Sequence, residues 1–317
     1  MISALAASPR VSGETLARSV GISRQALHKQ ILSLRKMGYE ILGRPKAGYR
    51  LASEPDRILA SRVLNGLKTK FMGKNLIVAE KTDSTQSEAK ALAEKGLSEG
   101  TTVLAEEQSN GKGRMGRSWE SGRGGLWFSV ILRPSLPPQK APLIALVSSL
   151  AVARAIESTV KVRCFLKWPN DILVKISKKG HRKICGSLIE MSSEPDRIVW
   201  AALGVGIDVN NALPKSLESV GISLNKITGK RIDRTLLFRS VLENLEGTYK
   251  KLLRGGFKNL KKEYVRRSLI RKGDKVVLDD SASRVRGNFV RFDPDGSIVL
   301  SMPDGERRNF YAGDVTL

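Results

Sequence analysis

The chain has 317 residues, enough for two or three domains, and its apolar share of 41% is ordinary for a globular protein. Only 5% of the residues are aromatic, which excludes a broad stacking platform. The formal net charge of +24 favours polyanions such as nucleic acid, although a generally basic proteome would give the same excess. No apolar run approaches the ~20 residues of a membrane span and no signal peptide is evident, so we expect a cytoplasmic protein without membrane partners.

The first 56 residues predict a small winged helix-turn-helix domain. Ser12 can cap a first helix and Ser23 a second, with Gly21 supplying the tight turn between them. The basic segment 39–51 predicts two short strands around a Pro/Gly turn, in the place of a wing. Without a wing, the pair would be a plain helical hairpin. With it, we expect DNA binding through the outward face of the second helix, which carries Arg24, Gln25, His28 and Lys29.

A polar, proline-containing stretch at 53–56 predicts a linker. Beyond it, the polar run 81–86 lies between a predicted strand at 76–80 and a helix. Short polar side chains such as Ser84 and Thr85 suit ligand hydrogen bonds, but helix capping alone also explains them.

A strand over 101–108 leads into residues 111–119, where three glycines and three cations fall within seven positions. Glycine lets backbone amides approach a phosphate closely, and Lys112, Arg114 and Arg117 supply positive charge. Dinucleotide and P-loop motifs need a helix at the last glycine, but the residues that follow are too rich in glycine for one. We therefore expect a mobile cationic loop between two strands that orders around an anion. The alternative is a solvated hairpin tip.

The middle of the chain supplies apolar core elements. A helix with an unusually apolar face begins at Pro142, and strand-like runs follow at 161–168, 183–190 and 200–210. Cys164 and Cys185 match no metal-ligand spacing and lie in these runs, so we expect both to be reduced core residues.

The last third predicts two helices followed by short strands. An amphipathic helix capped by Asp233 extends to about residue 253, and a second covers about 257–268. Short strands with Pro-Asp-Gly turns fill 271–317, a pattern that favours a small barrel.

Four motifs stand in a fixed order: the glycine loop followed by Trp119, Lys167-Trp-Pro-Asn-Asp171, Lys183-x-x-Gly-x-Leu-x-Glu190 and Gly204-x-Gly-Ile-Asp-Val-Asn210. In this order and at these intervals they resemble the biotin–protein ligase family. A winged helix ahead of them and a small barrel behind resemble its bifunctional bacterial form, the biotin operon repressor, over essentially the whole chain.

The resemblance implies an α+β multidomain fold. Residues 1–56 would form the winged helix domain and 57–270 a catalytic domain with a central mixed β-sheet flanked by helices, like that of class II synthetases. Residues 271–317 would form an SH3-like barrel.

The resemblance also implies the reaction and the partners. The enzyme would activate biotin with ATP and Mg²⁺ to biotinyl-5′-AMP, releasing pyrophosphate, and pass biotin to one lysine of a biotin carboxyl carrier protein domain. The form loaded with biotinyl-AMP would be a homodimer that binds operator DNA. Magnesium would be carried with ATP rather than by a metal site of the protein.

Roles for individual residues come from the same resemblance. Two anions meet in the reaction, so cations must offset their repulsion, and Lys183 and Arg114 would be the catalytic pair. Contacts to biotin would come from Ser84, Thr85, Gln86, Gln108, Lys112, Gly113, Arg114, Trp119 and Lys183. Contacts to ATP would come from Lys112, Arg114, Arg117, Lys167, Asn170, Asp171, Asp208 and Asn210.

Three residues depart from the family pattern. Lys112 stands where arginine is frequent, and Gln86 and Asp208 stand where asparagine is common, which puts the contacts of Gln86 and Asp208 in doubt. Two alternatives remain: a biotin-sensing transcription factor without catalysis, and a lipoate or other acyl ligase on the related fold.

Overall fold

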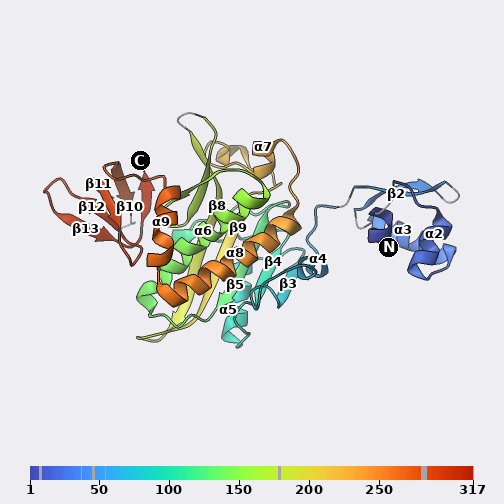
Figure 1. The fold of residues 1–317 in the computed structure, drawn as a ribbon, viewed down its shortest axis with the longest axis horizontal. Coiled ribbons are helices and arrows are strands. Elements are labelled where there is room, and N and C mark those ends of the chain that lie inside the picture. The colour runs from blue at the N-terminus through green and yellow to red at the C-terminus, as the bar shows by residue number, and fades with distance from the viewer. Residues whose placement is uncertain are drawn as a thin grey trace. The chain divides into compact units, whose positions relative to one another are not determined.

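The computed structural model describes residues 1–6, 9–36, 38–44, 47–53, 55–177, 180–279 and 284–316. Contacts divide this part of the chain into two compact units, Met1–Arg57 and Ile58–Leu317 (Figure 1). The domain boundaries expected after residues 56 and 270 stay predictions. Pro45 of the expected wing turn, Glu54 of the linker and two lysines of a polar turn, Lys178 and Lys179, lie outside the described residues.

The first unit has the predicted helix-turn-helix and hairpin. Helices α2 (Gly13–Val20) and α3 (Arg24–Lys36) precede the antiparallel strands β1 (Glu40–Arg44) and β2 (Gly48–Ser53). The Ser12 hydroxyl accepts a hydrogen bond from the Thr15 amide at 3.0 Å, and Gly21 takes the left-handed conformation with φ of 68°. A short helix that was not predicted, α1 (Ile2–Ala6), adds Leu5 to the core.

The second unit is built on a seven-stranded mixed sheet in the order β3-β4-β5-β9-β8-β7-β6. Only β3 and β4 are parallel, and every other pair is antiparallel. The strands are β3 (Leu76–Ala79), β4 (Thr102–Ala105), β5 (Leu126–Leu132), β6 (Cys164–Lys167), β7 (Asp171–Lys175), β8 (His181–Ser193) and β9 (Ile198–Ile207).

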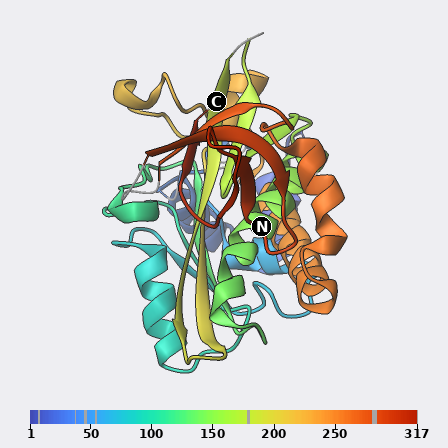
Figure 2. The ribbon, with the colours of Figure 1, turned by 90° about the vertical axis from the view of Figure 1, so that its left-hand side faces the viewer.

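Helices cover both faces of this sheet (Figures 1 and 2). Along β5, Ile131 packs with helix α5 (Thr85–Glu94), whereas its neighbours Val130 and Leu132 belong to the main core, because successive side chains of a strand point to opposite faces. On the main-core side lie α6 (Ala141–Thr159) and α8 (Arg234–Gly255). The shorter helices are α4 (Ala60–Leu64), α7 (Leu224–Thr228) and α9 (Lys258–Arg267).

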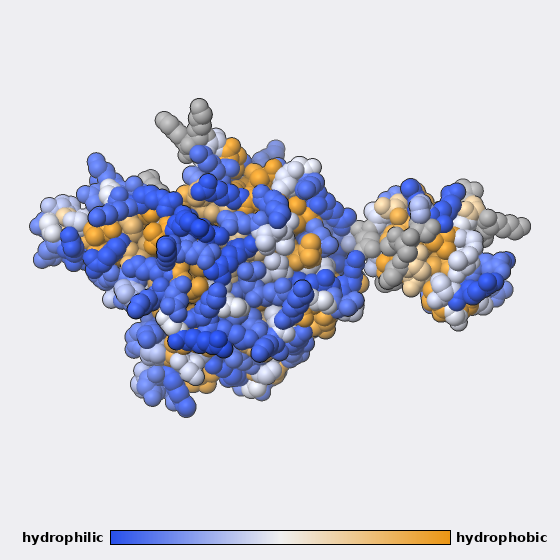
Figure 3. Space-filling model, in the orientation of Figure 1, coloured by the Kyte–Doolittle hydropathy of each residue, from blue (hydrophilic) through white to orange (hydrophobic). Residues whose placement is uncertain are grey.

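Helix α6 is the most apolar of the unit's long helices. Residues 138–159 are long and apolar enough to cross a membrane by length and composition, and an 18-residue window within them has a mean hydropathy of 1.4. The expectation that no apolar run approaches the length of a membrane span is therefore wrong. Most of this stretch is buried against α8 and the sheet, which is what a core helix requires. Hydrophilic residues cover most of the surface in Figure 3.

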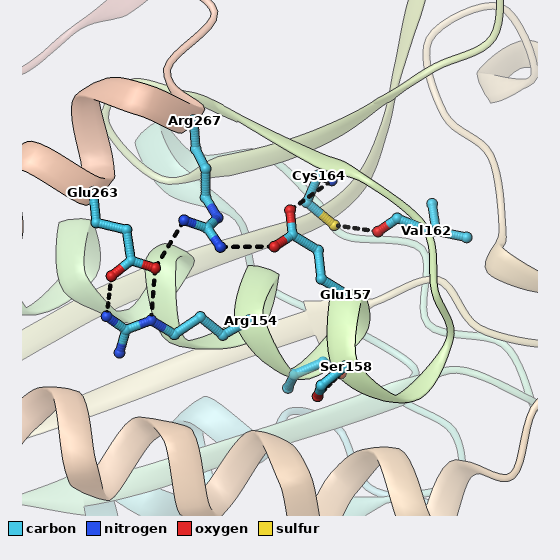
Figure 4. A network of polar contacts seen from close by, with 8 residues as sticks. Arg154, Glu157, Ser158, Val162, Cys164, Glu263 and Arg267 are labelled. Atoms are coloured by element: carbon cyan, nitrogen blue, oxygen red, sulfur yellow. Dashed lines mark hydrogen bonds and ion pairs between the residues drawn. The ribbon is translucent and has the colours of Figure 1, made fainter.

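A network of ion pairs joins α6 to α9 (Figure 4). Glu263 accepts from Arg154 Nε at 2.9 Å and from Arg267 at 2.7 Å. Arg267 also donates to Glu157, whose other oxygen accepts the Cys164 amide at 3.2 Å. The network therefore connects both helices to the start of β6.

The C-terminal strands form a five-stranded antiparallel sheet packed on this core. Its order is β13-β12-β11-β10-β14, made of β10 (Lys275–Asp279), β11 (Arg284–Phe292), β12 (Ile298–Ser301), β13 (Arg307–Phe310) and β14 (Asp314–Thr316). Trp168 Nε1 donates to the Gly296 carbonyl at 2.9 Å, and a side chain at Gly296 would collide with Leu143. Closure into an SH3-like barrel stays a prediction, because the described pairings run in one linear order.

Glu246 on α8 holds the segment before β3 in place, and its titration gives a test of the fold. The carboxylate accepts the backbone amides of Lys70, Phe71 and Met72 at 2.9 to 3.1 Å. Burial alone would raise the pKa of Glu246, but hydrogen bonds from Lys250 and from these amides lower it to about 2.

We expect Glu246→Gln to lower the free energy of unfolding at pH 7 by roughly 3 kcal/mol. A depressed carboxyl pKa stabilises the fold above the unfolded value of 4.5, and this contribution is lost as the pH falls towards 2. Urea denaturation should therefore show a smaller difference in the free energy of unfolding between variant and wild type at pH 3 than at pH 7. Glu243→Gln on the same helix, where the carboxylate accepts the Lys68 amide at 3.0 Å, is the control. A difference independent of pH would contradict this assignment.

Candidate functional site

A pocket opens over the middle of the large sheet, beside the glycine loop. Its walls come from the start of α5, from the loop between β4 and β5, and from β5, β8 and β9. Of the predicted site residues, it brings together Ser84, Thr85, Gln86, Gln108, Lys112, Gly113, Arg114, Arg117, Trp119, Asn170, Asp171 and Lys183. Residues separated by a hundred positions in the sequence therefore face one cavity.

Two paired glycines make room for the Trp119 indole. Gly186 on β8 and Gly206 on β9 are directly opposite each other in the ladder. A Cβ atom would lie 3.0 Å from the Trp119 ring at Gly186 and 2.5 Å from its Nε1 at Gly206, so neither position accepts a side chain without moving the indole. Trp119 Nε1 is buried and has no hydrogen-bond partner among the described residues.

The glycine loop is a small hairpin closed by its own backbone. The Trp119 amide donates to the Gly111 carbonyl at 2.8 Å, and the Gly113 amide to Arg117 at 2.7 Å. At its tip, Met115 has φ of 57°, an uncommon conformation for a residue with a side chain. The expected absence of a helix after the loop is confirmed, since strand β5 follows. The mobility of the loop stays a prediction.

Each of three cations in the pocket is engaged by a polar or acidic side chain of the protein. Lys183 Nζ lies 2.8 Å from the Asp171 carboxylate and 4.8 Å from the Trp119 ring centroid. Arg114 donates to the Asn170 side chain at 2.8 Å, and burial lowers its pKa. Arg117 pairs with Asp314, a residue of β14 in the C-terminal sheet.

The opposite end of the pocket is uncharged and hydrogen-bonded. Gln108 accepts the Thr85 amide at 2.8 Å and donates to Ser121 at 2.7 Å. Gln86 is buried and donates to the Ala202 carbonyl at 3.0 Å. Ser84 is the N-cap of α5, as the capping interpretation proposed, and it also lines the pocket.

A second pocket adjoins the first through Trp119, Asp171 and Lys183. It contains the predicted nucleotide-side residues Lys167 and Asp208. Asn210 lines neither of these two pockets. Its side-chain nitrogen donates to the Ile232 carbonyl, and its side-chain oxygen accepts a hydrogen bond from the Ile232 backbone amide, both at 2.9 Å. Its nucleotide contact stays a prediction.

Among the pocket residues that sequence reasoning missed are Ser129 and Asp314. Ser129 is the polar residue in the otherwise apolar run of β5, and that break in the pattern could have marked it. Asp314 lies far along the chain in a short edge strand, and no local pattern connects it to the glycine loop.

In the first unit, the four residues predicted to face DNA are exposed on α3: Arg24, Gln25, His28 and Lys29. Arg24 forms an ion pair with Glu14 of α2, so contact with a phosphate would require it to leave that partner. Both cysteines are free and buried, and burial raises the pKa of each thiol, as expected for reduced core residues.

A pocket with an uncharged hydrogen-bonding end and a cationic end, in a chain that also carries a helix-turn-helix, defines a ligand-binding enzyme with a DNA-binding module. Residues 78–210 match the biotin/lipoate A/B protein ligase family, and residues 1–50 match a helix-turn-helix domain.

Relatives cover the chain almost completely. The bifunctional ligase/repressor BirA of Bacillus spizizenii is 35% identical over 98% of this chain and 95% of its own. That of Escherichia coli is 28% identical over 96% and 92%. The solved biotin protein ligase of Aquifex aeolicus, in complex with biotin and ATP, superposes with a TM-score of 0.65 at 30% identity, covering 77% of this chain and 98% of that one. The chain belongs to the biotin–protein ligase family, in its bifunctional ligase/repressor form.

Asp208 is expected to make the stability of the fold depend on pH. Burial raises its pKa to about 7, against opposing contributions from the Asn211 hydrogen bond and from Lys183. The folded state therefore favours the protonated carboxyl, and ionisation costs stability as the pH rises from the unfolded value of 3.8 through 7.

Asp208→Asn removes this ionisation and keeps the size of the side chain. We expect the variant to unfold at a higher temperature than the wild type at pH 8, and at nearly the same temperature at pH 4. Scanning calorimetry at the two pH values measures the difference. A variant that is less stable at pH 8 would show that the carboxylate is well solvated there.

Proposed function

We propose that this chain is a bifunctional biotin–protein ligase and transcriptional repressor. A carboxylate oxygen of biotin would attack the α-phosphorus of ATP, breaking the bond to pyrophosphate and giving biotinyl-5′-AMP. A carrier lysine would then attack the carbonyl carbon, with AMP leaving and the amine losing a proton. The pocket itself carries this proposal, because its uncharged end suits a neutral ring and its cationic end suits two anions that must meet.

The ion pairs of the pocket support a role for Lys183 as the central cation. Its partner Asp171 balances its charge in the protein without ligand. An arriving carboxylate and α-phosphate would compete with Asp171 for the same ammonium group. Lys112, Arg114 and Arg117 would meet the phosphates in the same way, with Arg117 leaving Asp314.

The remaining roles follow from position. Ser84, Thr85, Gln86 and Gln108 would hold the ureido ring, and Trp119 would cover the apolar part of biotin and keep water from the mixed anhydride. Lys167, Asn170, Asp171 and Asp208 would line the nucleotide side. The described residues contain no group of three or more His, Cys, Asp or Glu side chains that could hold a metal ion, and we propose that Mg²⁺ arrives bound to ATP.

The first test is intact-mass analysis of a biotin carrier domain incubated with the protein, biotin and Mg-ATP. A gain of one biotin that requires ATP supports the ligase. Pyrophosphate release without transfer to the carrier would support only the activation step. No release at all would favour the alternative of a biotin-sensing transcription factor without catalysis. Repeating the reaction with lipoate in place of biotin separates the acyl-ligase alternative.

Lys183→Ala should lower the rate of pyrophosphate release by about 10²- to 10³-fold, the usual cost of removing one preorganised charge-stabilising donor. The fold should survive, since the side chain is a third exposed and its removal leaves Asp171 near solvent. Lys95→Ala, an equal charge change at the exposed C-cap of α5, is the control. Release at the wild-type rate in Lys183→Ala would remove Lys183 from the active site.

The repressor half of the proposal rests on the first unit. We propose that the form loaded with biotinyl-AMP binds a twofold-symmetric operator as a homodimer and that the protein acts in the cytoplasm. Ligand-dependent dimerisation is testable by sedimentation with and without biotin and ATP. Operator binding unaffected by both ligands would contradict a corepressor role.

Lys29→Ala should weaken binding to every duplex alike, because a phosphate contact carries no sequence information. The slope of the logarithm of the binding constant against the logarithm of the salt concentration should fall in magnitude by about one. Gln25→Ala should instead reduce discrimination between a duplex obtained by in vitro selection and a scrambled one. Fluorescence anisotropy over a salt series measures both. Lys36→Ala, at the exposed far end of α3, is the control, and equal losses for Lys29 and Lys36 would contradict the predicted orientation of the helix.

A further inference from the structure

Helix α9 separates its acidic residue from its exposed basic residues. Glu263 faces α6, where Arg154 and Arg267 engage it (Figure 4). Lys258, Lys262 and Arg266 are exposed and recur at every fourth residue, so they form a row on the solvent side of the helix. Successive members lie about 6 Å apart along the helix axis. In the part of the chain that the structure describes, no acidic side chain forms an ion pair with this row.

The row ends at a cationic groove between the end of α6, the start of β6 and the end of α9. The groove has a volume of about 440 Å³, and its charged lining residues are Glu157, Lys161, Arg163, Arg266 and Arg267. Arg267 donates to Glu157 at 2.7 Å, so these two charges offset each other within the protein. The other three cations leave the groove with a net charge of +3.

The two cations that precede β6 are both presented to solvent. Lys161 follows the end of α6 in a left-handed conformation, with φ of 63°. Glycine ordinarily takes this position after a helix, because a side chain there crowds the backbone. The lysine is therefore held where the backbone disfavours it, and its side chain is exposed. The Arg163 guanidinium lies 5.2 Å from the Phe165 ring centroid, which orients it without neutralising its charge.

The distribution of charge along the chain shows that the first unit supplies only part of the positive excess. Residues 1–57 hold ten lysines and arginines and four acidic residues, which gives +6 of the total of +24. The second unit therefore carries +18. The five cations assigned to the pocket and its nucleotide side do not account for this excess.

We propose that the row and the groove together form a second nucleic-acid surface, which binds the phosphate backbone without reading sequence. This surface, called the α9 surface below, consists of Lys161, Arg163, Lys258, Lys262 and Arg266. A nucleic acid strand carries phosphates at a fixed repeat, which matches a regular row of cations, whereas the carboxylates of an acidic protein follow no such repeat. Lysine and arginine contacts to phosphate position a duplex but carry no sequence information. The α9 surface thus goes beyond the proposed function, which assigns DNA contact to α3 alone.

Lysine footprinting on the full chain tests the location directly. The protein is acetylated briefly, with and without a duplex of scrambled sequence, and the modified lysines are quantified by mass spectrometry. The duplex should slow acetylation of Lys161, Lys258 and Lys262. The matched controls are exposed lysines outside α9 and the groove, Lys68, Lys95 and Lys230, and their rates should not change.

Two charge-matched triple variants test the contribution to binding. Replacing Lys258, Lys262 and Arg266 by Ala should lower the salt slope for the scrambled duplex by about three, since each lost phosphate contact removes about 0.9. Replacing Lys68, Lys95 and Lys230 by Ala removes the same charge and should leave the slope unchanged. Both variants should release pyrophosphate at the wild-type rate, because none of these residues lines the pocket.

Four results would overturn the proposal. Unprotected Lys258 and Lys262 would show that the duplex does not contact α9, and equal losses in the two triple variants would show that only total charge matters. Equal protection by polyglutamate at the same charge concentration would remove the preference for phosphate. Normal duplex binding with slower transfer to the carrier in the α9 variant would identify the surface as a site for an acidic protein.

Discussion

The ligase unit is organised around a buried ion pair between Glu106, just after β4, and Arg234, at the start of α8. The two side chains are 1% and 2% exposed and meet at 2.7 Å. Glu106 also accepts the amide of Ile58, the first residue of the unit, and Arg234 donates to the Gly125 carbonyl before β5. Removing either partner would leave a buried charge, a loss of about 3–5 kcal/mol. One contact thus fixes the start of the unit and both strands that carry the glycine loop.

From this anchor the pocket acquires two chemically different ends. Gln108 stands two residues beyond Glu106 and starts the uncharged end. The loop that follows brings Arg114 to Asn170 and Arg117 to Asp314. These acidic and amide partners hold the cations in place, and in the proposed reaction arriving anions would replace them. Between the ends, the glycine pair on β8 and β9 makes room for the Trp119 indole against the sheet. The register that pairs Gly186 with Gly206 therefore sets where Trp119 lies between the uncharged and the cationic end of the pocket.

The features that could be predicted from the sequence are those with local causes. Ser12, Gly21 and Asp233 mark helix ends through their own caps, and the structure confirms them. Asp314 contacts residues distant in the sequence, so no window of sequence could place it. The break in the apolar run of β5 could mark Ser129, but not its contacts with Thr85 and Gln86. Asn210 was assigned a nucleotide contact by its motif, which stays a prediction, and its side-chain amide is hydrogen-bonded to the backbone of Ile232. A motif predicts the region of the structure in which a residue lies, whereas packing determines which groups it contacts.

The pocket gathers its walls from α5, the glycine loop, β5, β8, β9 and the C-terminal strand β14. No single hairpin or helix pair of the unit contains enough of it to hold a ligand. Since a ligand stabilises only the species that binds it, biotin or ATP would add nothing to a partly unfolded chain and would protect the assembled unit as a whole. Ligand binding would make the cooperativity of unfolding greater, so that the large sheet and the C-terminal sheet are lost together.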